Sequence, residues 1–164
     1  MFNEKIRNMV LQEFNDNLKK ETLDEYLNSF KLKELRSFII LLALDCSDKN
    51  YSKILVSNKK KDIIQFIKEN FVLILEKFVK LVNPKDIKFL KKVLSKYSIE
   101  EKFIIESSLY LLMLLDNFNI AKIKYYHEIN QVSFYFPNEF SDTFLNLLDD
   151  SSILFQNKFC TNIN

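Results

Sequence analysis

Hydrophobic residues recur every three or four positions along most of this chain, which is the spacing of one face of an α-helix. The spacing predicts amphipathic helices over residues 2–18, 32–44 and about 59–82. The helix at 32–44 is apolar on most sides, which predicts a central position. Thr22, with Glu25 three residues later, has the pattern of a capping box and predicts a short helix after the first one.

Two polar signals mark the ends of the helix predicted over about 59–82. Ser57 or Asn58 is expected to cap its start. Asn83 precedes Pro84, and the residue before a proline is pushed out of the helical region, so the helix is expected to end there. Because proline fits the first turn of a helix, a new helix is predicted over 84–96.

The stretch after residue 97 predicts the most deeply buried helix. Ser98 and Glu101 have the pattern of a second capping box. Residues 98–117 are apolar nearly all round the helix, which is typical of a helix covered on every side. We therefore expect this segment to form the centre of the core.

The hydrophobic period then changes to two. Residues 120–126 and 131–137 alternate between apolar and polar positions, and a turn sequence separates them. This pattern predicts one β-hairpin over 120–137. A last amphipathic helix is predicted from Asn138 or Ser141 onward.

Together these elements predict a mainly α fold, a multi-helix bundle with one C-terminal β-hairpin. The 164 residues suffice for one sizeable core or two small ones. The boundary at Pro84 suggests an N-terminal helical region over 1–83 and a second region over 84–156, which can also form one continuous domain.

Composition removes several enzymatic chemistries. The chain contains no glycine, and glycine is needed for close backbone approach in phosphate-binding loops, dinucleotide-binding turns and nucleophilic serine elbows. His127 is the sole histidine and falls in or beside the hairpin turn, where Glu128 and, further on, Glu139 are nearby acids. No catalytic triad, metal cluster or cofactor motif is present, so we expect a protein that is not an enzyme and has no metal or cofactor.

Cysteine and apolar runs bear on location. Cys46 and Cys160 lie far apart in sequence, and free thiols are expected. The longest apolar runs, at 38–44 and 109–115, are seven residues each, whereas a bilayer span needs about 20. With no signal peptide at the start, a reducing cytoplasm and no membrane insertion are expected.

Charge is distributed unevenly along the chain. The net charge is +2, but residues 49–96 contain 13 lysines against four acidic residues, a local charge of +9. Lysine and phenylalanine have AT-rich codons, so an AT-rich bacterial or phage genome accounts for many of the lysines. It does not account for the shortage of acids in this segment, which favours a basic surface.

Two groups of lysines in this segment are candidate phosphate contacts. The first is Lys59, Lys60 and Lys61, at the start of a predicted helix, where backbone amides also favour anions. The second is Lys85, Lys88, Lys92 and Lys96, which fall on one side of the helix over 84–96. The alternative is that these lysines only solvate helix faces.

Part of the sequence resembles known nucleic-acid-binding modules. The segments LKELRSFIILLAL (32–44) and KKKDIIQFI (59–67) are similar to the helix-extended-helix modules of SAP type and of the N-terminal region of transcription termination factor Rho, a likeness that covers about residues 30–70. The resemblance implies core positions at Leu32, Leu35, Leu42, Ile63, Ile64 and Ile67. It implies nucleic-acid contacts at Lys59, Lys60 and Lys61.

The second half resembles a winged-helix arrangement, with two helices, a β-hairpin and a closing helix. In DNA-reading members the helix before the hairpin enters the major groove with polar side chains. Here that helix contains SSLYLLMLLDNF. We therefore expect it to be buried, and sequence-specific readout by it is not expected.

The leading hypothesis is a non-catalytic regulatory protein, for example in transcription, that contacts nucleic-acid backbones through residues 49–96. The alternative is a protein-interaction module or homodimer that uses aromatic residues of the hairpin, Tyr125, Tyr126, Phe134 and Phe136, some of which the alternation places outward. A third hypothesis, membrane-surface association through 84–96, is weaker because the core needs the apolar face of that helix.

Overall fold

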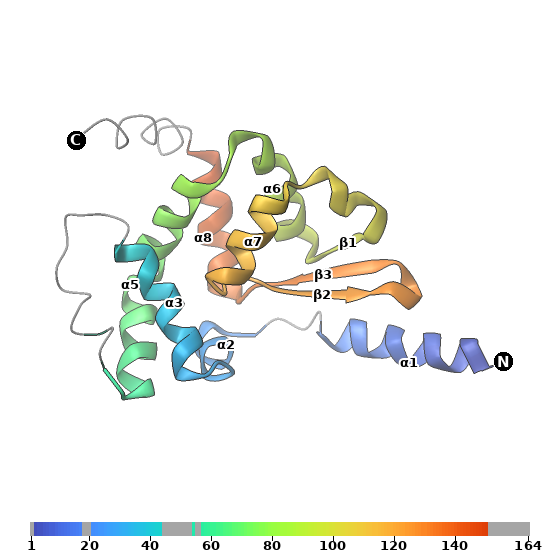
Figure 1. Cartoon of the computed structure of the whole chain (residues 1–164), viewed down its shortest axis with the longest axis horizontal. Coiled ribbons are helices and arrows are strands. Elements are labelled where there is room, and N and C mark those ends of the chain that lie inside the picture. The colour runs from blue at the N-terminus through green and yellow to red at the C-terminus, as the bar shows by residue number, and fades with distance from the viewer. Residues whose placement is uncertain (1, 18–20, 44–53, 55–56, 151–164) are drawn as a thin grey trace.

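The structure is a computed structural model that describes residues 2–17, 21–43, 54 and 57–150. Over these residues the chain is mainly helical, with a small antiparallel sheet toward the C-terminal side (Figure 1). The predicted fold class, a mainly α chain with one C-terminal hairpin, is confirmed.

Before Pro84 the predicted helices form with nearly the expected bounds. They are α1 (Phe2–Asn17), α2 (Leu23–Asn28), α3 (Leu32–Ala43) and α5 (Lys60–Leu81). The Thr22 capping box is confirmed, because its hydroxyl accepts from the Glu25 N–H at 3.2 Å and Glu25 accepts from the Thr22 N–H at 2.9 Å. The predicted cap of α5 is wrong: Lys59 occupies the N-cap position, and no side chain caps the helix there.

The sheet has three strands, one more than the sequence predicts. They are β1 (Ser98–Glu100), β2 (Lys122–Tyr126) and β3 (Gln131–Tyr135), in the order β1-β3-β2, with antiparallel pairing throughout. The hairpin of β2 and β3 matches the predicted hairpin. Ile99 lies opposite Val132, so the short β1 covers the free edge of β3.

The single long helix predicted over 98–117 is wrong. After α6 (Ile87–Lys96), Tyr97 takes a left-handed backbone conformation with φ 59°, which ends the helix. The chain then forms β1, a 3₁₀ segment η2 (Glu101–Glu106) and α7 (Leu109–Asn117). Of the two residues that suggested a capping box, Ser98 joins β1 and Glu101 begins η2, where the Glu101 N–H donates to the Asn130 carbonyl at 2.8 Å.

A buried carboxylate links the start of α6 to the start of α7. Asp86, at the end of the 3₁₀ segment η1 (Pro84–Asp86), is only 1% exposed. Its two oxygens accept from the Ser108 backbone N–H at 3.0 Å and from the Ser108 hydroxyl at 2.5 Å. The Ser108 oxygen in turn accepts from the Leu111 N–H at 3.1 Å, so Ser108 is the true cap of α7.

One hydrophobic cluster contains buried residues from both sides of Pro84. The closing helix α8 (Asn138–Asp149) packs against α5 and α6 (Figure 1). The positions that the SAP-like resemblance implies are part of this cluster: Leu35, Leu42, Ile63, Ile64 and Ile67 are buried, and Leu32 is partly buried. The lysines of α6 therefore lie on the side of that helix that faces away from the core.

Candidate nucleic-acid interface

A lysine-rich groove runs along α6. Its volume is about 720 Å³, and its lining residues are Lys85, Lys88, Phe89, Lys91, Lys92, Ser95, Lys96 and Glu106. The groove follows from the sequence pattern, since Phe89, Leu90, Val93 and Leu94 turn into the core and leave the lysines on the opposite side. We call these lining residues the lysine groove.

The lysine groove brings together the four lysines predicted over 84–96 and adds Lys91. Lys85 and Lys96 are eleven positions apart, which corresponds to about 16 Å along a helix. The lysines are therefore arranged as a row along α6 and not as a point cluster. A row of cations suits an extended polyanion better than a single phosphate.

Two of these lysines have carboxylate partners. Lys91 Nζ lies 2.5 Å from Asp149, and Lys92 Nζ lies 3.9 Å from Glu106 and 4.6 Å from the centre of the Phe103 ring. Among the described residues, no ion pair forms at Lys85, Lys88 or Lys96, all of which are exposed. These three lysines can meet an anion without first losing a partner.

The lysine run at the start of α5 has a partly structural role. Lys60 Nζ donates to the carbonyl of Asn28, the last residue of α2, at 2.8 Å. A cation is favourable at a helix C-terminus, where carbonyls are unpaired and the helix dipole is negative. Lys59 and Lys61 are exposed. The run thus lies at an unfavourable end of α5 but at a favourable end of α2.

The structure does not bring the two predicted lysine groups together. Helix α5 has 22 residues, which corresponds to about 33 Å. Lys59, Lys60 and Lys61 lie at its start, whereas α6 begins just beyond its end (Figure 1). The two predicted lysine groups are therefore separated by about the length of α5.

The aromatic residues of the hairpin are mostly core residues. Phe134 and Phe136 are 0% and 1% exposed, and Tyr126 is 2% exposed because the Phe14 ring of α1 packs against it at 5.2 Å. Tyr125 alone of the four lies on the surface, at 43% exposed. The expected outward placement holds for Tyr125 only, since neighbouring elements cover both faces of β3.

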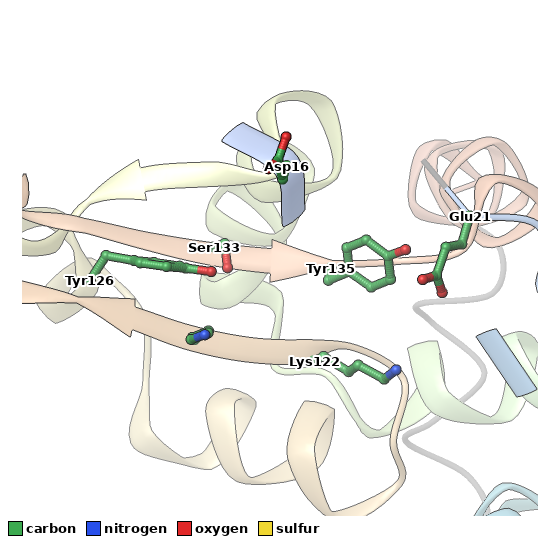
Figure 2. A pocket seen from close by; sticks show the side chains of 7 residues that line it. Asp16, Glu21, Lys122, Tyr126, Ser133 and Tyr135 are labelled. Carbon is green, nitrogen blue, oxygen red and sulfur yellow. The ribbon is translucent and has the colours of Figure 1, made fainter. Parts of the chain in front are cut away.

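A second cavity, of about 390 Å³, lies between α1 and the hairpin (Figure 2). It is lined by Asp16, Glu21, Lys122, Lys124, Tyr126, Ser133 and Tyr135. Figure 2 shows the Tyr135 hydroxyl directed toward Glu21. Sequence reasoning missed this cavity because its residues come from segments more than 100 positions apart, and no local pattern marks them.

The two lysines of this cavity, Lys122 and Lys124, both have partners. Lys122 Nζ donates to the Ser29 hydroxyl at 2.6 Å and lies 4.9 Å and 4.7 Å from the rings of Tyr26 and Phe30. Burial lowers the pKa of Lys122, although Glu21 and Glu34 act in the opposite direction. Lys124 forms a hydrogen-bonded ion pair with Glu13, which raises the Lys124 pKa.

The raised pKa values of Tyr26 and Tyr135 predict a loss of stability at alkaline pH. Burial, with nearby Tyr135 and Glu21, raises the pKa of Tyr26 well above its usual value, and burial with a Glu21 hydrogen bond raises the pKa of Tyr135. Below about pH 10 both states keep these protons. Above it the unfolded state loses protons that the folded state keeps, so the free energy of unfolding falls by about 1.4 kcal/mol per pH unit for buried Tyr26.

Urea unfolding at pH 8 and pH 11 measures this loss. Lys122 has the opposite sign over the interval just below about pH 10.4, because there its folded form binds fewer protons. The Tyr26→Phe variant also loses the hydrogen bond to the Asn119 carbonyl and is less stable at pH 8. Between pH 8 and pH 11, the free energy of unfolding of this variant is expected to fall by less than that of the wild type. An equal fall in both proteins would contradict the assignment to Tyr26.

His127 lies in the hairpin turn and its side chain is exposed, as expected. Its Nδ1 lies 2.6 Å from Glu101, a partner that is 26 positions away in the sequence.

Across the described ranges, no group of three or more His, Cys, Asp or Glu side chains is placed to hold a metal ion. In the same part of the chain, no helix is long and apolar enough to cross a membrane. Cys46 and Cys160 lie outside the described residues.

No protein-family model, curated protein sequence or solved structure matches this chain. The resemblances to SAP-type and Rho N-terminal modules and to winged-helix proteins therefore stay predictions. The functional proposal rests on the geometry of the lysine groove.

Proposed function

We propose that this protein binds nucleic-acid backbones through the lysine groove and has a regulatory, non-catalytic role. The observation that supports the proposal is the convergence of five lysines on one groove, with Lys85, Lys88 and Lys96 exposed and unpaired within the described part of the chain. Phosphate contacts by such lysines give affinity that does not depend on base sequence.

The local surroundings favour anions over other ligands. Glu106 contributes a carboxylate to the lining, but Lys92 lies beside it and offsets its charge. The row of lysines extends for about 16 Å, which lets it contact successive phosphates of one strand. Lys59 and Lys61 are a separate secondary contact that only a long ligand can reach at the same time.

A salt titration of the full chain tests the proposal. Three to five phosphate contacts predict that log Kd rises with log salt with a slope of about 2 to 3.5 for single strands and about 3 to 4.5 for duplexes. Fluorescence anisotropy with labelled oligonucleotides of mixed sequence measures this slope. Absence of binding at about 50 mM salt, or binding that ignores salt, would be incompatible with the proposal.

The alternative, a protein-interaction module that uses the hairpin aromatics, has less support. Its predicted contact surface is reduced to Tyr125, because the other three aromatic residues are buried. Tyr125 also stacks on His127, with ring centres 5.8 Å apart. One exposed aromatic side chain is ordinary for a protein surface and does not by itself indicate a docking site.

A further inference from the structure

Exposed apolar side chains gather on η2 and α7, the elements that begin beside α6. Ile105 is 85% exposed and Leu109 is 73% exposed, the two largest values among the apolar side chains of the described residues. Met113 and Tyr110 follow on α7, at 51% and 45%. We call these four residues the apolar rim. Clustered exposed apolar residues of this kind usually mark a surface that binds a partner.

Two contacts place the apolar rim along α6. Lys92 Nζ lies 3.9 Å from Glu106, the neighbour of Ile105. Further back along α6, Asp86 accepts both hydrogen bonds from Ser108, the neighbour of Leu109. The segment that carries Ile105 and Leu109 therefore follows α6 from Lys92 toward its start. Ile105 and Leu109 therefore flank the segment that supplies Glu106 to the lysine groove, and Tyr110 and Met113 continue from it along α7.

A ligand that suits this surface must combine closely spaced negative charge with apolar faces. A single-stranded nucleic acid has both, since its phosphates are exposed and its bases are free to stack on aromatic and apolar side chains. A duplex keeps its bases stacked inside and would leave the apolar rim in water. We propose, building on the proposed function above, that the ligand is single-stranded, with phosphates along the lysine groove and a base stacked on Tyr110.

Charge and shape argue against the other occupants of the apolar rim. In a symmetric pairing, a second copy of the chain would bring its own row of lysines toward the first row, and like charges repel. An anionic bilayer is flat, so it would bridge the concave groove and also cover the exposed carboxylates of Glu106 and Asp116. A flexible single strand can follow the groove and leave these carboxylates in water.

The chain contains no tryptophan, so Tyr110→Trp introduces a unique fluorescent reporter at the stacking position. Single-stranded oligothymidylate and oligouridylate of about 12 nucleotides are expected to quench its emission, because the bases stack on the indole. A mixed-sequence duplex and heparin, a polyanion without bases, are expected to bind without quenching. Tyr110→Ala is expected to weaken single-strand binding about tenfold and to leave duplex and heparin binding within about twofold.

Tyr125→Trp is the matched control, since Tyr125 is 43% exposed against 45% for Tyr110 but lies on the hairpin. Two results would overturn the single-strand inference, provided that heparin still binds and so shows the groove to be intact. One is quenching of tryptophan at position 125 but not at position 110. The other is equal affinity for single strands and duplexes that Tyr110→Ala does not change. Failure to bind any polyanion would overturn the proposed function itself.

Two further measurements test the other occupants directly. Flotation with vesicles of phosphatidylglycerol and phosphatidylcholine tests a bilayer, and sedimentation velocity tests a second copy. We expect no binding to these vesicles. We also expect no dimer whose formation depends on Leu109, which the Leu109→Ser variant would reveal. Either result would assign the apolar rim to that partner and overturn the inference.

Discussion

Changing Lys88 and Lys96 together to glutamate is expected to weaken nucleic-acid binding about 100-fold at about 50 mM salt. Both lysines are exposed members of the lysine groove, without an ion pair among the described residues. Each phosphate contact adds a salt slope of about 0.7 to 0.9, which corresponds to roughly tenfold in affinity at that salt relative to 1 M. The salt slope of the double variant is therefore expected to fall by about 1.4 to 1.8, as anisotropy titrations would show.

Lys59→Glu with Lys61→Glu is the matched control for this variant. It changes the net charge by the same amount, from +2 to −2, but at the start of α5, about 33 Å from α6. A ligand of about six nucleotides placed on the groove is expected to keep its affinity within about threefold, whereas one of about 40 nucleotides can also lose contacts at Lys59 and Lys61. Equal losses in both variants with the short ligand would show that only net charge matters.

Phe140→Ala is expected to cost about 3–5 kcal/mol of stability, the largest stability effect that we predict. Phe140 of α8 is fully buried. The centre of its ring lies 6.2, 6.4 and 6.0 Å from the ring centres of Tyr26, Phe38 and Phe71, respectively. It thus joins α8 to α2, α3 and α5. The loss is a large part of the total stability of a typical domain, about 5–15 kcal/mol, and should lower the melting temperature by about 10–15 °C.

Two substitutions place this result on a scale. Phe140→Leu keeps most of the apolar volume and is expected to cost clearly less, about 1–1.5 kcal/mol. Tyr125→Ala removes an exposed ring and should stay within about 0.5 kcal/mol of the wild type. Chemical denaturation followed by circular dichroism measures all three. A Phe140→Ala chain within about 1 kcal/mol of the wild type would mean that the four helices do not depend on this ring.

The helices could be predicted because their signals are local. Apolar spacing, the Thr22 capping box and Pro84 placed α1, α2, α3, α5 and α6 within a few residues, since each signal acts within one or two turns of the helix that it marks. The same helical spacing predicted that Lys85, Lys88, Lys92 and Lys96 share one side of α6, and the structure places them in one groove.

The strand β1 could not be predicted in the same way. It has three residues, and its pairing depends on β3, more than 30 positions later. In most proteins a glycine marks the left-handed residue that ends a helix, but this chain has none, and Tyr97 takes that conformation. Without a sign of extended backbone after Tyr97, the apolar residues from Ser98 onward predicted a new helix over 98–117.

The remaining surface features depend on contacts between distant segments. Lys60 bonds to Asn28, which is 32 positions away, so the reason for a lysine at the start of α5 lies in another helix. The apolar rim was expected to be buried as part of a long helix, and it became exposed only because that helix is divided. Local patterns give the identity of such residues but not the elements that cover them.

The hydrogen bonds between Asp86 and Ser108 also affect how the groove meets a ligand. Because they tie the start of α7 to the start of α6, the lysines and the apolar rim keep their relative positions before any strand arrives. Binding therefore need not order the protein side of the interface, and most of the entropic cost falls on the flexible nucleic acid. In the proposed complex, such a preorganised surface would bind a flexible strand without a conformational change of its own.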